Sequence, residues 1–265
     1  MDFFELLEEV RRTPEALSIP QSWGQGRASF GGVVAALVYA VMRSKVPAER
    51  PPRSLAITFV GPVESGVATH FEAEVLREGK AVSQVLGRAL QNGAVVALVQ
   101  GSFGASRSSS IKVDAQPAPT IKSVENSQEL PYIPRVTPEF TRHLAMRWGL
   151  GGLPFSGTQS REMGGWVRFR DQGRVETLDE AHLLGLVDAW PPAVLSLLKG
   201  PAPGSSLTWT IEFIQPMVSV TSDQWCLYRA EIEHARDGYG HVAAALWTPG
   251  GELLAISRQT VTVFG

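Results

Sequence analysis

The chain has 265 residues, of which 44% are hydrophobic and 19% are charged, and its formal net charge is −2. This composition is typical of a globular protein with one large domain or two smaller ones. Without a basic excess, neither nucleic acid nor an anionic membrane surface is an expected partner. The only cysteine, Cys226, excludes an intramolecular disulfide and a thiolate zinc site.

The N-terminal residues are acidic, whereas a signal peptide begins with basic ones. The longest apolar run, Gly31 to Met42, is too short for a bilayer span, which needs about 20 residues. We therefore expect a cytoplasmic protein with no membrane span.

Two helices are predicted early in the chain. Residues 2–10 have apolar side chains at helical spacing, and Asp2 with Glu5 matches a capping box. Residues 33–43 are apolar on nearly every face, which predicts a buried helix.

Four strand-like segments follow, at residues 54–60, 70–76, 82–90 and 94–103. Asn92-Gly93 between the last two is a strong hairpin signal. The first part of the chain therefore reads as a long apolar helix followed by an antiparallel meander.

Residues 106–140 have the composition of a linker, with a serine run and five prolines. We expect a unit of residues 1–105, a linker of residues 106–140 and a second unit of residues 141–265.

After the linker the first pattern returns. A strand at residues 165–170 precedes a helix at 183–198, and strands follow at 206–214, 224–234, 241–247 and 253–263. Residues 55–62 can be laid over residues 209–216 so that the apolar positions coincide and both segments end in proline. The order and spacing of these elements predict an internal duplication.

An apolar helix must be covered, and a strongly curved antiparallel sheet can wrap it. Two such units can join edge to edge, which also hides exposed strand edges. The expected fold class is α+β, with two tandem units that each wrap a long helix.

This arrangement resembles the acyl-CoA thioesterase II family and its wider group of double-hotdog proteins. The segments that carry the resemblance are Phe30 to Leu37, Leu76 to Lys80, Gln91 to Gly93, Leu184 to Leu195, Ser205 to Met217 and Leu253 to Gln259.

The resemblance also implies a catalytic set of an aspartate, a serine or threonine, and a glutamine. It places these roles on Asp188, Ser206 and Gln259. Where the family has an Asp-His pair soon after its hydroxyl, this chain has Thr208-Trp209, so Thr208 is the reserve candidate for the hydroxyl.

Asp188 stands among apolar residues, just before Pro191 and Pro192, and we expect it at the entry of the second helix. Burial raises the pKa of a carboxyl group, while a helix N-terminus favours the anion. A carboxylate between these tendencies suits the activation of water. The alternative is an aspartate that only caps the helix.

Gln259 shares its strand face with apolar residues, so its amide needs a polar partner. It can orient a water molecule together with Ser206, although a core glutamine bonded to backbone and a turn serine are the alternatives. Gly31 and Gly32 can supply backbone N–H donors for a thioester oxyanion, or they can simply permit tight packing.

Other chemistries find less support. There is no G-x-S-x-G motif, and the five histidines show no metal-ligand spacing, so we expect neither metal nor organic cofactor. Four tryptophans are candidates for an acyl tunnel or for ordinary core packing: Trp23, Trp148, Trp166 and Trp190.

The resulting hypothesis is a thioesterase that hydrolyses a fatty or related acyl-CoA with water activated by Asp188. The alternatives are a non-catalytic acyl-CoA or lipid-binding protein and a hotdog enoyl-CoA hydratase. The hydratase ranks lower because no histidine accompanies Asp188. The resemblance also implies a homodimer or higher homo-oligomer.

Overall fold

The computed structural model describes residues 1–170 and 173–264. Its first helix, α1 (Phe3–Arg12), begins with the expected capping box. The backbone N–H of Glu5 donates to Oδ1 of Asp2 over 2.8 Å, and the Glu5 carboxylate accepts from the Asp2 N–H over 2.7 Å. The apolar stripe of α1 is buried against the second helix, α2 (Gly31–Arg43). Short elements lie between them: β1 (Leu17–Ser18), the 3-10 helix η1 (Gln21–Trp23), β2 (Gly24–Gln25) and β3 (Ala28–Ser29).

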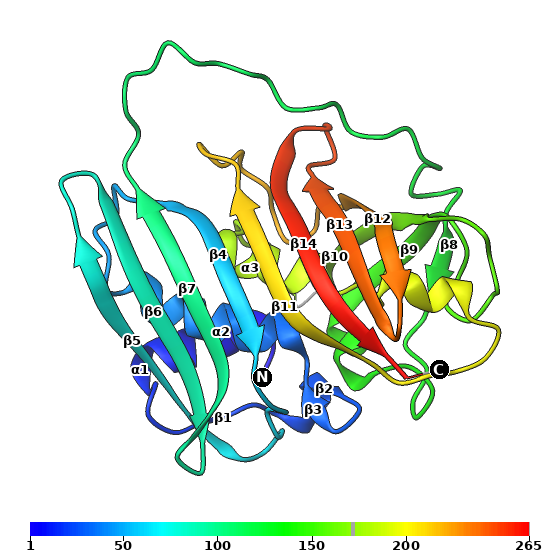
Figure 1. Cartoon of the computed structure of the whole chain (residues 1–265), viewed down its shortest axis with the longest axis horizontal. Coiled ribbons are helices and arrows are strands. Elements are labelled where there is room, and N and C mark those ends of the chain that lie inside the picture. The colour runs from blue at the N-terminus through cyan, green and yellow to red at the C-terminus, as the bar shows by residue number, and fades with distance from the viewer. Residues whose placement is uncertain (171–172, 265) are drawn as a thin grey trace.

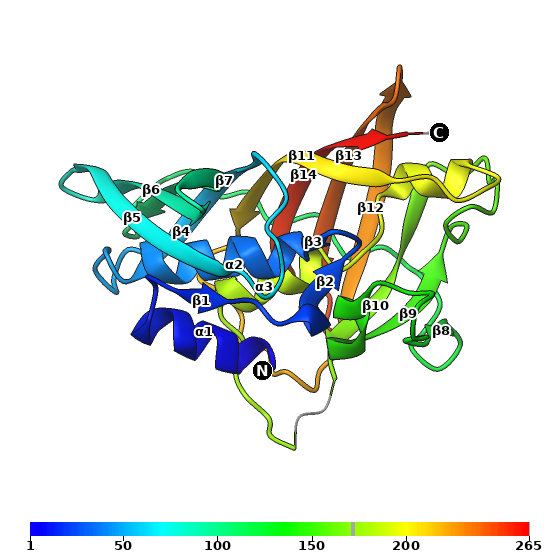
Figure 2. The ribbon, with the colours of Figure 1, turned by 90° about the horizontal axis from the view of Figure 1, so that it is seen from below.

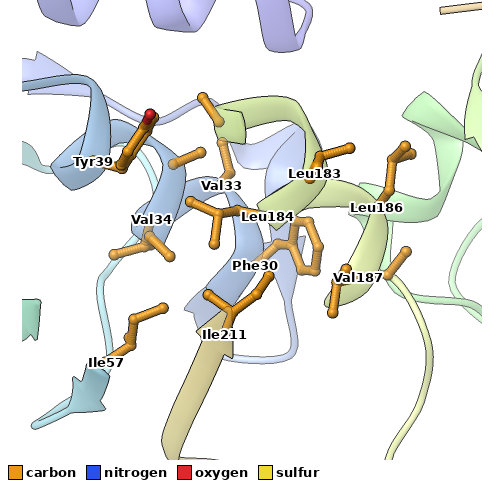
Figure 3. Packing of buried hydrophobic residues seen from close by; sticks show 14 of the residues in the cluster. Phe30, Val33, Val34, Tyr39, Ile57, Leu183, Leu184, Leu186, Val187 and Ile211 are labelled. Carbon is orange, nitrogen blue, oxygen red and sulfur yellow. The ribbon is translucent and has the colours of Figure 1, made fainter. Parts of the chain in front are cut away.

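Helix α2 is buried on almost every face, as its composition predicts. It packs against the third helix, α3 (Glu180–Val187). Figure 3 shows that Val33 and Val34 of α2 meet Leu184 of α3 in one apolar cluster with Phe30. The two helices thus form a layer with no polar face turned to solvent, and this layer requires a sheet to cover it.

A 12-stranded sheet provides that cover, with α2 and α3 lying against one face and α1 beyond them (Figures 1 and 2). The first half contributes the short β1, which pairs with β5 at the edge of the sheet, together with β4 (Pro52–Phe59), β5 (Ala68–Glu78), β6 (Val82–Gln91) and β7 (Ala94–Gly104). The hairpin between β6 and β7 turns at Asn92 and Gly93, both with positive φ (51° and 78°), as the Asn-Gly pair predicts.

The second half contributes β11 (Gly204–Phe213), β12 (Cys226–Arg236), β13 (Tyr239–Trp247) and β14 (Leu253–Val263). The halves join where β4 pairs antiparallel with β11. Ala56 opposes Thr210 at the centre of this pairing. On either side, Leu55 opposes Ile211 and Ile57 opposes Trp209. In the superposition of residues 55–62 on residues 209–216, these two pairs are equivalent, so the pairing of β4 with β11 is symmetric about Ala56 and Thr210.

Three further strands extend the sheet on the second-half side: β8 (Gln128–Leu130), β9 (Leu144–Leu150) and β10 (Glu162–Phe169). The segment expected to be a linker therefore contains β8 as well as part of the 3-10 helix η2 (Glu139–His143). Strand β9 was not predicted, although Leu144, Met146 and Trp148 alternate as buried residues along it.

The expected helix over residues 183–198 is wrong in its extent. Helix α3 ends at Val187, and a separate 3-10 helix, η3 (Ala193–Leu197), follows Pro191 and Pro192. Proline has no N–H to donate and clashes with the preceding turn, so the pair ends one helix and begins another.

Candidate active site

Asp188 lies at the C-terminal end of α3, not at the entry of a helix. Its φ of −81° and ψ of −4° are still helical, and its N–H donates to the Leu184 carbonyl over 3.2 Å. The expectation that its own helix N-terminus stabilises the carboxylate is therefore wrong, because a helix C-terminus disfavours an anion.

The favourable helix end comes from α2 instead. The backbone N–H of Gly32, in the first turn of α2, hydrogen-bonds to the Asp188 carboxylate. Gly31 makes the approach possible, since a Cβ at that residue would stand 2.8 Å from Asp188 Oδ2 and 3.0 Å from Cζ of Phe59. The N-terminus of a helix in the first half thus faces a carboxylate of the second half.

Gln259 connects Asp188 to Ser206. Its Nε2 donates to Oδ1 of Asp188 over 2.8 Å, and its Oε1 accepts from Ser206 Oγ over 3.4 Å. These two partners fix the orientation of the Gln259 amide, because a carboxylate can only accept a hydrogen bond and a hydroxyl can donate one. The structure brings together the three side chains that the sequence singled out, although their catalytic roles are a separate matter.

An irregularity in β11 determines which hydroxyl reaches Gln259. The pairing of β11 with β14 shifts by one residue between Ser206, opposite Val261, and Thr208, opposite Thr260. Such a bulge reverses the facing of the side chains on one side of it. Ser206 consequently shares the inner face with buried Trp209, whereas Thr208 is exposed on the opposite face.

Burial dominates the electrostatics of the site. Desolvation raises the pKa of Asp188 to about 7, and the hydrogen bonds from Gln259 and Gly32 act in the opposite direction. Asp188 as a whole residue is half-buried, and its carboxyl group is the part that is turned into the protein. A carboxyl group with this pKa changes between acid and base near neutral pH, which is the property of a general base.

Tyr228 of β12 is a neighbour that sequence reasoning missed. Burial raises the pKa of its phenol, and the nearby Asp188 carboxylate raises it further. The ring of Trp190 stacks on Tyr228 with centroids 5.1 Å apart. No local pattern in the sequence indicates Tyr228, because it comes near Asp188 only through the packing of β12 against the segment that follows α3.

The glycine prediction divides into separate contributions. The N–H of Gly32 is directed at Asp188, and a Cβ there would stand 2.9 Å from the Leu184 carbonyl oxygen, so this glycine also permits close packing of α2 on α3. Gly31 borders the carboxylate directly. An oxyanion role for either backbone N–H stays a prediction.

Neither a reactive thiol nor a metal site is indicated beside this carboxylate in the part of the chain that the structure describes. Cys226 is buried, and desolvation raises the pKa of its thiol to about 12. Within residues 1–170 and 173–264, no three or more His, Cys, Asp or Glu side chains gather in a way that could hold a metal ion. In that same part of the chain, no helix has the length and apolar character needed to cross a bilayer.

Two surface hollows are found among the described residues, and neither includes Asp188, Ser206 or Gln259. The larger, of about 420 Å³, is bordered by the turn at Arg27 and by Glu64 and Ser65. The other, of about 270 Å³, lies over β5 and β6 beside Glu72 and Arg88.

Solved structures define the class of fold. A hotdog-fold protein from Alicyclobacillus acidocaldarius is 22% identical, with 94% of this chain and 92% of that one covered and a TM-score of 0.80. The acyl-CoA thioesterase II TesB2 from Mycobacterium marinum is 20% identical, with 97% and 98% covered and a TM-score of 0.69. The tesB protein of Mycobacterium avium subsp. paratuberculosis is 17% identical, with 98% and 100% covered and a TM-score of 0.72. The chain thus has an α+β fold of the hotdog class.

Family models lead from the fold to the family. The acyl-CoA thioesterase N-terminal domain matches residues 19–104, and the acyl-CoA thioesterase C-terminal domain matches residues 116–263. A search of curated proteins finds no match. The chain belongs to the acyl-CoA thioesterase family, and it is a thioester hydrolase.

Proposed function

We propose that this protein hydrolyses an acyl-CoA to the free acid and CoA with a water molecule activated by Asp188. The observation that carries the proposal is the hydrogen-bonded series Ser206–Gln259–Asp188, which ends on a carboxyl group whose pKa lies near 7. A general base is most effective when its pKa is close to the working pH.

In the proposed reaction, the Asp188 carboxylate removes a proton as the water oxygen bonds to the thioester carbonyl carbon. The resulting tetrahedral oxyanion is stabilised by backbone N–H groups at the start of α2, with Gly31 the first candidate. Collapse of this intermediate breaks the C–S bond, and the departing thiolate takes the proton from Asp188. The products are the acid and the CoA thiol, and Asp188 is again a carboxylate.

Ser206 and Gln259 have positioning roles in this proposal. The Gln259 amide fixes the Asp188 carboxylate through Nε2, and it orients the Ser206 hydroxyl through Oε1. Such positioning removes much of the entropic cost of bringing water and thioester together. No cofactor or metal enters any step.

We also propose that the architecture is a double hotdog, with units at residues 1–105 and 141–265 and the intervening segment as a connection. The symmetric register across β4 and β11 supports this division. A homo-oligomer, a cytoplasmic location and a role in fatty acid metabolism stay predictions of the same kind.

Thiol release from acyl-CoA, measured for the wild type and for Asp188→Asn, tests the proposed function. The variant keeps the size of the side chain but cannot accept the water proton, so we expect a loss of at least about 100-fold in kcat. Full activity in Asp188→Asn would remove this residue from the mechanism. If the wild type binds acyl-CoA and releases no thiol, the non-catalytic alternative is correct.

A further inference from the structure

The aromatic residues beside Asp188 bear on which acyl groups the site accepts. Trp148 on β9, Gly165 on β10 and Tyr228 on β12 are direct neighbours across three adjacent strands. Direct neighbours across antiparallel strands project from the same face of a sheet. Gly165 has no side chain, so this row contains a gap between two large rings.

Trp190 fills that gap. Its ring lies 5.1 Å from the Tyr228 ring at 6° and 5.5 Å from the Trp148 ring at 54°. A Cβ at Gly165 would stand 1.9 Å from the Arg147 backbone oxygen, which by itself requires glycine here, and 2.9 Å from Cη2 of Trp190, which shows that the indole lies directly against this glycine. Trp190 follows Asp188 by two residues, so the base and this ring belong to the same short segment.

The indole N–H of Trp190 is buried without a hydrogen-bond partner. A buried donor without a hydrogen-bond partner is uncommon in proteins. Trp148 differs, because its indole N–H donates to the Gly151 carbonyl over 3.0 Å. Of the two tryptophans beside Gly165, Trp190 is therefore the one whose indole N–H is not tied to the backbone.

We propose that Trp190 closes the acyl pocket, so that this thioesterase prefers short, compact acyl groups to long straight chains. The inference rests on the proposed function, since it assumes that the thioester carbonyl lies against Asp188. With the carbonyl there and the CoA portion toward solvent, the acyl chain points into the protein. In that direction the gap over Gly165, between Trp148 and Tyr228, is the natural channel, and the indole occupies it.

The packing at Gly165 supports this reading, because the Trp190 ring lies against both the Tyr228 ring and the Trp148 ring. A site for long chains needs an apolar cavity, and such pockets usually form before the ligand binds. Here the matching volume is filled by aromatic rings. Replacing Trp190 by a small residue leaves a groove with Gly165 as its floor and two rings as its walls.

The test compares kcat/KM for acyl-CoA substrates from acetyl to palmitoyl in the wild type and in Trp190→Ala. We expect the wild type to favour acetyl or butyryl substrates over octanoyl and palmitoyl ones. In Trp190→Ala the ratio of octanoyl to butyryl turnover should rise at least about tenfold, because each newly accommodated methylene contributes about fourfold. Trp190→Phe should give a smaller rise and keeps an aromatic ring if the alanine variant folds poorly.

Trp247→Ala is the matched control. Trp247 is as buried as Trp190, at 6% exposure, and its indole N–H also has no partner, but it lies at the end of β13 beside Leu227 and Leu253. This variant loses the same side-chain volume and should keep the wild-type ratio. Equal hydrolysis of butyryl and palmitoyl substrates by the wild type overturns the inference, and so does an unchanged ratio in both Trp190 variants.

A binding measurement separates this inference from the proposed function. Acyl-CoA affinity is measured in Asp188→Asn with and without Trp190→Ala. If the wild type releases no thiol from any substrate, the proposed function fails, while the chain-length dependence of binding still decides the role of Trp190. If only the double variant gains affinity for long acyl chains, Trp190 closes the pocket. If the two variants show the same dependence of affinity on chain length, it does not.

Discussion

Tyr39 occupies in α2 the position that Asp188 occupies after α3, since each follows the first residue of its helix by eight positions. The Tyr39 hydroxyl donates to Oε2 of Glu180 over 3.1 Å, and Glu180 is the first residue of α3. Asp188 faces the first residues of α2 in the same way. The two ends of the helix pair are therefore built alike, but only one carries the aspartate.

The strands show the same correspondence. Pro52 opposes Phe103 just before a bulge in β4, as Ser206 opposes Val261 just before the bulge in β11. Leu55 opposes Gly101, as Trp209 opposes Gln259. Tyr39, Pro52 and Gly101 thus stand where the other half has Asp188, Ser206 and Gln259. Within the residues that the structure describes, the proposed duplication accordingly leaves one candidate active site of this kind.

Tyr39→Phe is expected to weaken the fold and leave hydrolysis unchanged. The change removes one hydrogen bond to a charged group, while Gln215 still donates to Glu180 over 2.8 Å. We expect the free energy of unfolding to fall by about 1–2 kcal/mol. Chemical denaturation and thiol release on the same samples provide the check, and a large loss of kcat would mean that this end of the helices takes part in the reaction.

The pH dependence of hydrolysis should report the ionisation of Asp188. Burial raises its pKa to about 7, and the base must be ionised, so kcat/KM should rise with pH up to about 7 and then level off. Gln259→Ala removes a hydrogen bond that lowers this pKa. The rising part of the pH profile of kcat/KM should therefore move to higher pH in Gln259→Ala, and its plateau should be lower than that of the wild type.

Rate profiles from pH 5 to 9 make this comparison direct. A rising part at the same pH in Gln259→Ala and the wild type would show that Asp188 is not the group that titrates, or that the hydrogen bond is absent in solution.

Ser206→Ala and Thr208→Ala should differ. The Ser206 hydroxyl reaches Gln259, whereas Thr208 lies beyond the bulge with its side chain exposed. We expect Ser206→Ala to lower kcat by about tenfold or more with little change in KM, because positioning acts mainly in the transition state. Thr208→Ala is the matched control and should behave as the wild type. The reverse order would place the working hydroxyl at Thr208.

Local signals made much of the fold predictable. The capping box at Asp2 and Glu5 and the Asn92-Gly93 turn each depend on a few neighbouring residues, and both form as expected. Helix α2 was predictable because it is apolar on nearly every face, which requires burial. The alternation of Leu144, Met146 and Trp148 is an equally local signal of a strand. It directly follows the proline-rich segment expected to be a linker, and strand β9 was not predicted for that reason.

The site was predictable in its residues and not in its electrostatics. The sequence placed a helix N-terminus at Asp188, and the favourable N–H comes instead from Gly32 in the other half of the chain. The face of the sheet from which Ser206 projects depends on the bulge between Ser206 and Thr208, and no local sequence pattern near Leu207 predicts that bulge. Both features arise from tertiary contacts and strand register, to which a local reading has no access.

Gly31→Ala should impair activity more than stability, and Gly32→Ala the reverse. A methyl group on Gly31 meets the Asp188 carboxylate and the Phe59 ring tip, both side-chain atoms that can shift. On Gly32 it meets Cζ of the Phe30 ring at 2.6 Å and the Leu184 backbone oxygen at 2.9 Å, and because a backbone oxygen cannot turn aside, α2 and α3 must separate. We expect Gly32→Ala to lose about 1–3 kcal/mol through overpacking, and Gly31→Ala to lose hydrolysis with a nearly unchanged melting temperature.

Asp188→Asn should also alter how stability depends on pH. The pKa of Asp188 rises from about 3.9 in an unfolded chain to about 7 in the fold, so between these values the folded state holds a proton that the unfolded state has released. Stability must then fall as pH rises through this interval, by up to about 1.4 kcal/mol per pH unit from this group alone.

A second group opposes that trend in the wild type. The His143 ring stacks on the Trp23 ring with centroids 4.0 Å apart. Desolvation by this burial is the main cause that lowers the pKa of His143 to about 4. Its contribution to stability rises between about pH 4 and 6.5, because the unfolded state binds the proton there.

The difference between wild type and Asp188→Asn cancels the His143 contribution and isolates Asp188. Urea denaturation from pH 4 to 8 should show the variant gaining stability relative to the wild type as pH rises, with the gain complete near pH 7. If the difference in free energy of unfolding between the two proteins stays constant over this range, Asp188 is already ionised at pH 4 in the folded state. Its pKa would then not be matched to a general base that works near neutral pH.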